Sequence, residues 1–251
     1  MQILTKIHRK IGQLLRVKTF ENKYYCSDFP LRQCLKSREI TVFDVGANAG
    51  QSIERFYKNY NVKEYYAFEP QNVEFQNIKT KYSHYKGIKF YNNAFGEVEK
   101  EAKINRTLKS GTSTLNDYNT SSEYVKTKIK THQVTHCEDL IIEKQPVQVM
   151  TLDNFIESNT IKKIDLLKID TEGYESKILK GAQRTLATQS INCIEVELTF
   201  DDRFGKTGNF YDIEQYLVPN GFNLCGIDEP YSRPHRSIFH VNCVYIKDKI
   251  T

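Results

Sequence analysis

The sequence predicts an α/β domain organised around a mostly parallel, doubly wound sheet. Strand-like and helix-like segments alternate over most of the 251 residues, which is the order that parallel sheets require. The first strand-like run, Thr41–Val45, leads into a turn that carries Gly46 and Gly50 and then into a helical pattern. A strand, a tight turn and a helix in this order open the nucleotide-binding half of many α/β sheets.

Composition sets the broad class of the protein. Hydrophobic residues make up 39% of the chain and the formal net charge is +5, so a substantial core is expected and nucleic acid is not indicated as a partner. The sequence has no apolar run of about 18 residues and no recognisable secretory signal, so we expect neither a membrane span nor a signal peptide. Six scattered cysteines without a C-x-x-C pair favour reduced thiols and a cytoplasmic location.

The first 18 residues have a pattern of their own. Ile3, Ile7 and Leu14 belong to an apolar stripe with three- and four-residue spacing, interleaved with basic residues such as Lys6 and Arg9. This pattern is typical of a basic amphipathic helix. We favour docking of this helix on the domain or on a second subunit, and a position on a membrane surface is the alternative. The chain is therefore divided into a helical lead segment, residues 1–40, and a domain, residues 41–251.

The spacing of apolar residues predicts the elements of the domain in order. Before the first interruption we expect a helix, a strand, a helix, a strand, a helix and a strand: Pro30–Lys36, Thr41–Val45, Gln51–Tyr60, Lys63–Phe68, Asn72–Tyr82 and Ile88–Phe95. Later we expect a short helix, a strand, a helix, a strand, a helix and two strands: Leu152–Glu157, Ile164–Ile169, residues 174–187, Ile191–Leu198, Phe210–Val218, Phe222–Ile227 and Ile238–Lys247. Only a short loop separates the last two strands, which predicts an antiparallel pair.

The segment around residues 97–148 interrupts this alternation. It is rich in Thr, Ser, Lys and Glu, and it has short alternating pieces at Ala102–Asn105 and Val125–Val134. We interpret it as an insertion of short strands and mobile loops. Loops at the carboxyl edge of a parallel sheet commonly carry substrate contacts, so we expect this insertion to shape the substrate site.

The turn from Gly46 to Gly50 distinguishes between cofactors. A dinucleotide fingerprint requires G-x-G-x-x-G, whereas residues 47–49 are Ala, Asn and Ala. The loop therefore suits the amino-acid end of S-adenosylmethionine better than a pyrophosphate. Glu69 ends the second strand about 20 residues later, where an acid can bind both ribose hydroxyls of an adenosine. The structural alternatives are an ordinary strand-to-helix turn and an exposed acid beside a proline.

Acidic residues gather at one edge of the predicted sheet. Four of them come from four different strands: Asp44, Glu69, Asp170 and Glu195. Like charges so placed repel one another, and a sulfonium ligand, a bound cation or a general-base role would each relieve the repulsion. Asp170 and Glu195 are the candidate ligands for a divalent cation such as magnesium. Glu172 and Glu175 lie in the first turn of the following helix, where helix capping explains them as well as catalysis does.

His132 and His136 are four residues apart within the insertion. On a helix both imidazoles would share one face, as a metal pair does. The segment has strand-like alternation and offers no third ligand at a fixed spacing. We therefore favour a loop histidine that faces the substrate.

Six blocks of the sequence together resemble the FkbM-type methyltransferases. The blocks are Phe43–Gly50, Ala67–Pro70, Thr151–Asp153, Leu166–Glu175, Leu179–Ala182 and Ile194–Val196. They are collinear over roughly residues 41–247, and the K-I-D-x-E-G-x-E block followed by L-K-G-A is the most specific. The resemblance implies the Rossmann-like fold of class I methyltransferases, with a mostly parallel seven-stranded sheet and an antiparallel last strand.

The resemblance also implies a function and a set of site residues. It implies S-adenosylmethionine-dependent O-methylation of a sugar, glycan or other natural product. We expect seven cofactor-binding residues: Asp44, Gly46, Asn48, Gly50, Glu69, Asn93 and Asp170, the last near the methyl group. Residues 200–206 and Asn242 depart from the common pattern of the family. Both departures lie where acceptor specificity could be set, so the acceptor does not follow from the resemblance.

Transfer of a methyl group to a sugar hydroxyl requires a base or an acidifying metal, because the hydroxyl is a poor nucleophile at neutral pH. The candidate bases, in falling order, are Asp170, Glu172, His132 and His136. Three other functions stay open: methylation of a non-sugar natural product, a nicotinamide-dependent oxidoreductase, which the missing third glycine disfavours, and a non-catalytic protein at a membrane surface that retains the fold.

Overall fold

The computed structural model describes residues 28–36, 38–188, 190–205, 208–228, 231–232 and 238–248. The predicted amphipathic helix at residues 1–18 lies outside the described residues. Within the described ranges, no helix has both the length and the apolar character needed to cross a membrane.

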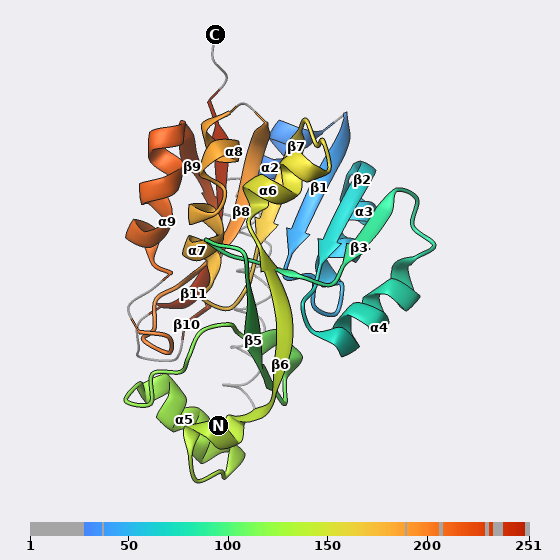
Figure 1. Ribbon diagram of the computed structural model, residues 1–251. Coiled ribbons are helices and arrows are strands. Elements are labelled where there is room, and N and C mark those ends of the chain that lie inside the picture. Colours follow the sequence, from blue (N-terminus) through green and yellow to red (C-terminus); the bar gives the residue numbers. More distant parts are fainter. Residues whose placement is uncertain are drawn as a thin grey trace, which may run out of the picture.

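One large sheet forms the centre of the fold (Figure 1). Its described strands are β1 Glu39–Val45, β2 Asn61–Phe68, β3 Ile88–Tyr91, β7 Ile164–Ile169, β8 Ile191–Thr199, β9 Phe222–Ile227, β10 Tyr231–Ser232 and β11 Ile238–Lys247. The order is β10-β11-β8-β7-β1-β2-β3, and β9 also pairs with β11. The five neighbouring strands β8, β7, β1, β2 and β3 run parallel, whereas β11 is antiparallel to β8 and β9. The predicted fold class and the antiparallel pair of final strands are both confirmed.

Helices cover both faces of this sheet (Figure 1). On one face the core contains apolar residues of α2 Asp28–Leu35, α3 Gln51–Asn59 and α4 Asn72–Tyr82. On the other face it contains residues of α6 Leu152–Ser158, α7 Glu175–Lys180, α8 Gln183–Ala187 and α9 Phe210–Leu217. Strand β7 is buried at every position, which is why its sequence is almost continuously apolar.

Two predicted elements are interrupted. The strand expected at Ile88–Phe95 ends at Tyr91, and Ala94–Phe95 form a separate strand, β4, in a second sheet. Between them, the Asn92 side chain donates hydrogen bonds to the carbonyl oxygens of Glu69 and Pro70, so the chain turns away from the first sheet. The single helix expected at residues 174–187 is split into α7 and α8 around Gly181. A Cβ at Gly181 would lie 2.0 Å from the carbonyl oxygen of Gly96, so this close approach requires glycine.

The insertion forms a small sheet and a helical unit. Its elements are β5 Lys100–Thr107, the 3-10 helix η1 Ser110–Thr112, α5 Glu123–His132, the 3-10 helix η2 Cys137–Leu140 and β6 Ile141–Met150. The strand expected at Ala102–Asn105 lies within β5. The strand expected at Val125–Val134 is wrong, because most of that segment is helix: Ser122 caps α5 by accepting from the Tyr124 N–H, and Tyr124, Val125 and Ile129 pack on one side.

A row of charged side chains crosses the three central strands close to their carboxyl ends. Asp44 of β1 pairs in register with Lys168 of β7, which pairs with Glu195 of β8. The Lys168 ammonium lies 3.2 Å from Asp44 Oδ1 and 3.3 Å from Asp170 Oδ2. Arg55 of α3 donates to both carboxylate oxygens of Glu195, at 2.6 and 2.7 Å. Two cations of the chain itself therefore relieve the repulsion among the acids at this edge.

The surroundings of Lys168 keep it charged although it is buried. Burial by itself disfavours the ammonium, but the carboxylates of Asp44, Asp170 and Glu195 outweigh it, and the pKa of Lys168 lies above its ordinary value. Asp44 is fully buried and also accepts a 2.7 Å hydrogen bond from the Tyr65 hydroxyl. The row is a fixed part of the core.

We predict that Arg55→Met destabilises the fold by about 3 kcal/mol, the low end for breaking a buried ion pair, because Glu195 would stay buried without its partner. Urea unfolding at neutral pH measures this change. Adding Glu195→Gln to Arg55→Met should recover part of the loss, since the unpaired buried charge is then removed. Lys81→Met, at the exposed ion pair with Glu54, is the matched control and should leave stability nearly unchanged. An Arg55→Met variant as stable as this control would contradict the prediction.

Candidate functional site

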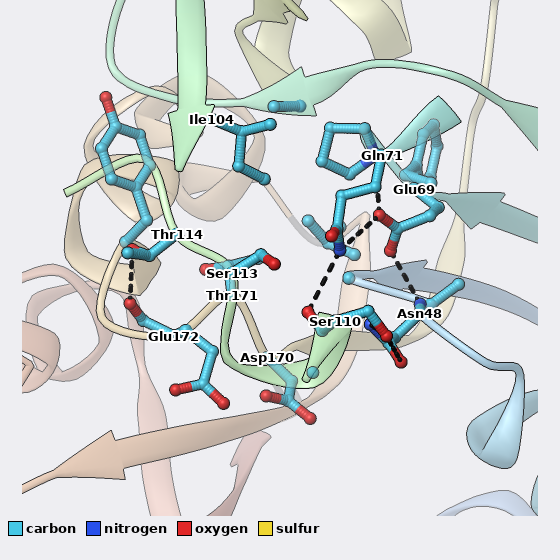
Figure 2. Close-up of a pocket in the computed structure, with 18 of the residues that line it drawn as sticks. Asn48, Glu69, Gln71, Ile104, Ser110, Ser113, Thr114, Asp170, Thr171 and Glu172 are labelled. Atoms are coloured by element: carbon cyan, nitrogen blue, oxygen red, sulfur yellow. Dashed lines mark hydrogen bonds between the residues drawn. The ribbon is translucent and has the colours of Figure 1, made fainter. Parts of the chain in front are cut away.

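A cavity of about 390 Å³ lies at the carboxyl ends of the central parallel strands, a size that suits a small-molecule ligand. Strands β1, β2, β7 and β8 form its floor, and residues of the insertion form its roof (Figure 2). Six of the predicted site residues line it: Gly46, Asn48, Glu69, Asn93, Asp170 and Glu172. Of the four acids expected to converge at this edge of the sheet, Glu69 and Asp170 line the cavity.

The glycine loop has its shape because neighbouring groups leave no room for side chains. Gly46 has φ +89°, and a Cβ there would lie 1.9 Å from the backbone oxygen of Asp170. Gly50 has φ +85°, and a Cβ there would lie 2.1 Å from the ring of Tyr82. Asn48 between them also has a positive φ of 42°, a conformation that asparagine tolerates. Gly46, Ala47 and Asn48 line the cavity, whereas Gly50 shapes the turn without lining it.

Glu69 stands at the end of β2 with only 2% of its surface exposed. Its Oε2 accepts from the backbone N–H of Asn48 at 2.8 Å, and its Oε1 accepts from the backbone N–H of Gln71 at 2.8 Å and from the Gln71 side chain at 3.2 Å (Figure 2). Burial raises the pKa of Glu69 to about 7, although these hydrogen bonds oppose the shift. The carboxylate therefore holds the glycine loop and the start of α4 together around the cavity.

The insertion contacts residues at both ends of the cavity. At one end, Asn48 Nδ2 donates to Ser110 Oγ at 3.3 Å, and Gln71 Nε2 donates to the Ser110 carbonyl at 3.2 Å (Figure 2). At the other end, the Thr114 hydroxyl donates to the Glu172 carbonyl at 2.8 Å. Sequence reasoning did not assign roles to Gln71 and Ser110. For Gln71, the available signal was its place two residues after Glu69.

The turn after β7 carries Asp170 and Glu172 and is held from within by Glu175. Glu175 is fully buried, and its Oε1 accepts from the Thr171 N–H at 2.7 Å, the Thr171 hydroxyl at 3.0 Å and the Gly173 N–H at 3.2 Å. Of the two explanations open for Glu175, capping is the one that this geometry supports. Glu175 therefore accepts the hydrogen bonds from the backbone N–H groups of this turn that Asp170 could otherwise accept. The Asp170 carboxylate is left to face the cavity.

Asp170 and Glu172 differ in their surroundings. The Asp170 side chain is 38% exposed and faces the ammonium of Lys168. Glu172 has a positive φ of 54°, and its Oε2 accepts from Arg203 at 3.1 Å. Burial, followed by the negative charge of Glu197, raises the pKa of Glu172 well above its ordinary value, against the opposing effect of Arg203.

Two residues of the site were missed by sequence reasoning. Glu197 of β8 lines the cavity with 7% of its surface exposed, and its Oε1 is hydrogen-bonded to Nδ1 of His240 from β11. Burial and then the charge of Asp170 raise the pKa of Glu197, and His240 opposes the shift. The signal was the alternation of Glu195 and Glu197 along β8: both side chains point to the same face, but Glu197 is closer to the carboxyl end.

The remaining predicted residues lie elsewhere. Asp44 is in the buried charged row and does not line the cavity. His132 is the last residue of α5 and borders a second, smaller cavity, whereas His136 lies beyond that helix at the start of η2. Both histidines are exposed, and the helix face that they were considered to share is absent.

The structure gives the predicted magnesium pair no support from side-chain geometry. Both carboxylate oxygens of Glu195 are bound by Arg55, while Asp170 faces Lys168. Across the described ranges, no three His, Cys, Asp or Glu side chains are grouped as a metal site would require.

The comparisons with known proteins agree with this geometry. Residues 44–224 match the family model of the methyltransferase FkbM domain. The chain belongs to the FkbM methyltransferase family. No curated protein matches the chain.

Among solved structures, the chain is similar to the FkbM methyltransferase from Methylobacillus flagellatus, with a TM-score of 0.52 and 15% identity. That match covers 86% of this chain but only 46% of the other protein, so the chain spans about half of its length. A putative S-adenosylmethionine-dependent methyltransferase from Listeria monocytogenes gives a TM-score of 0.48 at 9% identity, covering 89% of this chain and 97% of that one.

We predict that Glu175→Gln becomes more stable relative to the wild type as the pH rises. Burial raises the pKa of Glu175 from 4.5 to about 7, so between these values the folded state binds a proton that the unfolded state has lost. The wild type therefore loses stability over this range, and the glutamine variant lacks this loss. The difference in unfolding free energy should grow by about 3 kcal/mol, at 1.36 kcal/mol per pKa unit.

Urea unfolding of both proteins from pH 4.5 to 8 tests this prediction. Glu157→Gln, at an exposed side chain, is the control and should show no comparable trend. A constant difference between Glu175→Gln and the wild type would show that Glu175 does not titrate as described.

Proposed function

We propose that this chain transfers a methyl group from S-adenosylmethionine to a hydroxyl of a sugar or glycan acceptor. The observation that carries the proposal is the group of carboxylates at the open end of the cavity, Asp170, Glu172 and Glu197. A hydroxyl must lose its proton as it attacks, so a site for O-methylation needs a base at this place. A neutral amine attacks through its lone pair without such a base, so the carboxylates favour oxygen as the nucleophile.

The cofactor fits the side of the cavity opposite these carboxylates. Gly46, Ala47 and Asn48 of the glycine loop line this side, which is where the amino-acid end of the cofactor is expected. Glu69 lies where an acid can accept hydrogen bonds from ribose hydroxyls, and Asn93 lines the same region. When bound, the cofactor would supply an electrophilic methyl group on a sulfonium, and the carboxylate of Asp170 favours a cation there.

The polar lining supports a sugar as the acceptor. Carboxylates and the hydroxyl-bearing Ser113 and Thr114 surround the open end, and sugar hydroxyls can both donate to and accept from such groups. The insertion supplies the two hydroxyl-bearing residues, in line with the expectation that it shapes the substrate site. A hydroxyl of a non-sugar natural product is the alternative acceptor. Screening nucleotide sugars, oligosaccharides and phenolic compounds for release of S-adenosylhomocysteine separates the two, and methylation of phenolic compounds alone would reject the sugar proposal.

We predict that Glu69→Ala weakens S-adenosylmethionine binding by about 1.5–3 kcal/mol, the range for hydrogen bonds to charged groups. Isothermal titration calorimetry measures the dissociation constant, and thermal unfolding checks that the variant is folded. Glu64→Ala, an exposed acid on the same strand, is the control and should bind the cofactor as the wild type does. Equal affinities of the Glu69→Ala and Glu64→Ala proteins would reject the ribose role.

We predict that Asp170→Asn lowers turnover at least about 100-fold, the lower end for a group that acts in proton transfer or orients the reacting hydroxyl. The substitution retains the shape of the side chain and removes its charge, and cofactor affinity should change only modestly. Because Glu175 caps the turn, Asp170 has no capping role that would account for a loss of activity. Near-normal turnover of Asp170→Asn on a confirmed acceptor would remove Asp170 from the mechanism.

A further inference from the structure

Glu197 lies at the end of the cavity where the proposed reaction needs a base, and sequence reasoning gave it no role. It lies two residues after Glu195 on β8, so both side chains point to the same face of the sheet. Glu195 stays beneath Arg55, but Glu197 reaches the cavity at the end where Asp170 and Glu172 also lie. With 7% of its surface exposed, it is screened from bulk water while still lining the cavity.

His240 fixes the orientation of this carboxylate. The residue comes from β11, the antiparallel neighbour of β8, and its Nδ1 is hydrogen-bonded to Glu197 Oε1. Because Oε1 is held from the side of β11, Oε2 is the oxygen that can face an acceptor. The His240 side chain is 37% exposed, so the pair connects the cavity with solvent.

The alternative base, Asp170, has a less suitable environment. Its carboxylate is already engaged in an ion pair, 3.3 Å from the buried ammonium of Lys168. The groups around Glu197 have a net effect on its pKa. Burial and the charge of Asp170 raise its pKa, while His240 and Arg203 oppose the shift without cancelling it. A general base is most effective when its pKa lies near the working pH.

We propose that Glu197 accepts the proton of the acceptor hydroxyl and that His240 positions its carboxylate. This inference rests on the proposed O-methylation and assigns the base for that site. Asp170 is then left to orient the hydroxyl and to face the sulfonium.

The step balances as a substitution at carbon. The O–H bond of the acceptor breaks and its proton moves to Glu197 Oε2, while the oxygen forms a bond to the methyl carbon. The bond between that carbon and sulfur breaks, and its electron pair stays on sulfur. The products are the methyl ether, neutral S-adenosylhomocysteine and one proton, which leaves Glu197 for solvent along the side of the exposed His240 imidazole.

Glu197→Gln tests the assignment, since glutamine has the same shape and can still bond to His240. Turnover on a confirmed hydroxyl acceptor should fall at least about 100-fold, the lower end for a general base, with the cofactor dissociation constant within a few-fold of the wild type. Glu64→Gln, outside the cavity, is the matched control. Turnover of Glu197→Gln close to that of the control would overturn the proposal.

The pH dependence of turnover distinguishes Glu197 from Asp170. The groups that face Glu197 are Asp170, Glu172 and Glu175 after β7, Arg203 after β8 and His240 on β11. His240→Asn removes a partner that stabilises the ionised carboxylate, so the rising limb of the kcat profile should move to higher pH. Asp170→Asn removes a neighbouring negative charge, so the limb should move to lower pH. If Asp170→Asn abolishes the limb instead, Asp170 is the base and the proposal fails.

A measurement that needs no acceptor tests the Glu197–His240 pair by itself. The hydrogen bond to Glu197 raises the pKa of His240. In an NMR titration, the His240 ring signal, assigned with His240→Asn, should titrate at lower pH in Glu197→Gln than in the wild type. An unchanged His240 titration would overturn the pair. If the pair is present but no hydroxyl compound is methylated, the proposed O-methylation has failed, and the assignment of Glu197 as its base fails with it.

Discussion

The buried ammonium of Lys168 is the constraint on which the candidate site depends. It lies within 3.3 Å of carboxylates from Asp44 and Asp170, and so connects β1 with the end of β7. A buried cation needs such partners, because the cost of removing it from water is otherwise too high. The arrangement places the Asp170 carboxylate at the edge of the cavity with little freedom to move.

The two acids of β8 have different roles: Glu195 forms a buried ion pair, and Glu197 lines the cavity. Glu195 is clamped by Arg55 from α3, and Glu197, one step closer to the edge, lines the cavity and contacts His240. The guanidinium of Arg55 neutralises the negative charge of Glu195 close to the site. Without it, the carboxylates near Asp170 would raise one another's pKa further. The ion pair of Glu195 with Arg55 therefore affects the electrostatics of Glu197, which lies on the same face of β8 but nearer the cavity.

Local patterns predicted most of the fold. The strand Ile164–Ile169 and the helix Asn72–Tyr82 were predicted with the observed bounds. The first is an apolar run interrupted only by Asp165 and Lys168, and the second has clear helical spacing. The helix α5 was mistaken for a strand, since its alternating lysines and threonines hide the packing of Tyr124, Val125 and Ile129.

The site was predicted less completely, because much of it depends on contacts between distant residues. Strand ends identify Glu69 and Asp170 from the sequence, since every parallel strand presents its carboxyl end to the same edge. The partners of these acids carry no such local signal. Arg55 is 140 residues from Glu195, and His240 is 43 residues from Glu197. Only the folded sheet brings these pairs together.

The contacts of Ser110 determine how easily the roof over the glycine loop can open. The roof over the glycine loop is held there by two neutral hydrogen bonds, from Asn48 and Gln71. Each such bond contributes only about 1 kcal/mol, so lifting this part of the roof costs on the order of 2 kcal/mol. That free energy corresponds to an open population of about 3% at equilibrium. A small molecule in the cavity can therefore exchange through brief local openings while the sheet and its charged row stay intact.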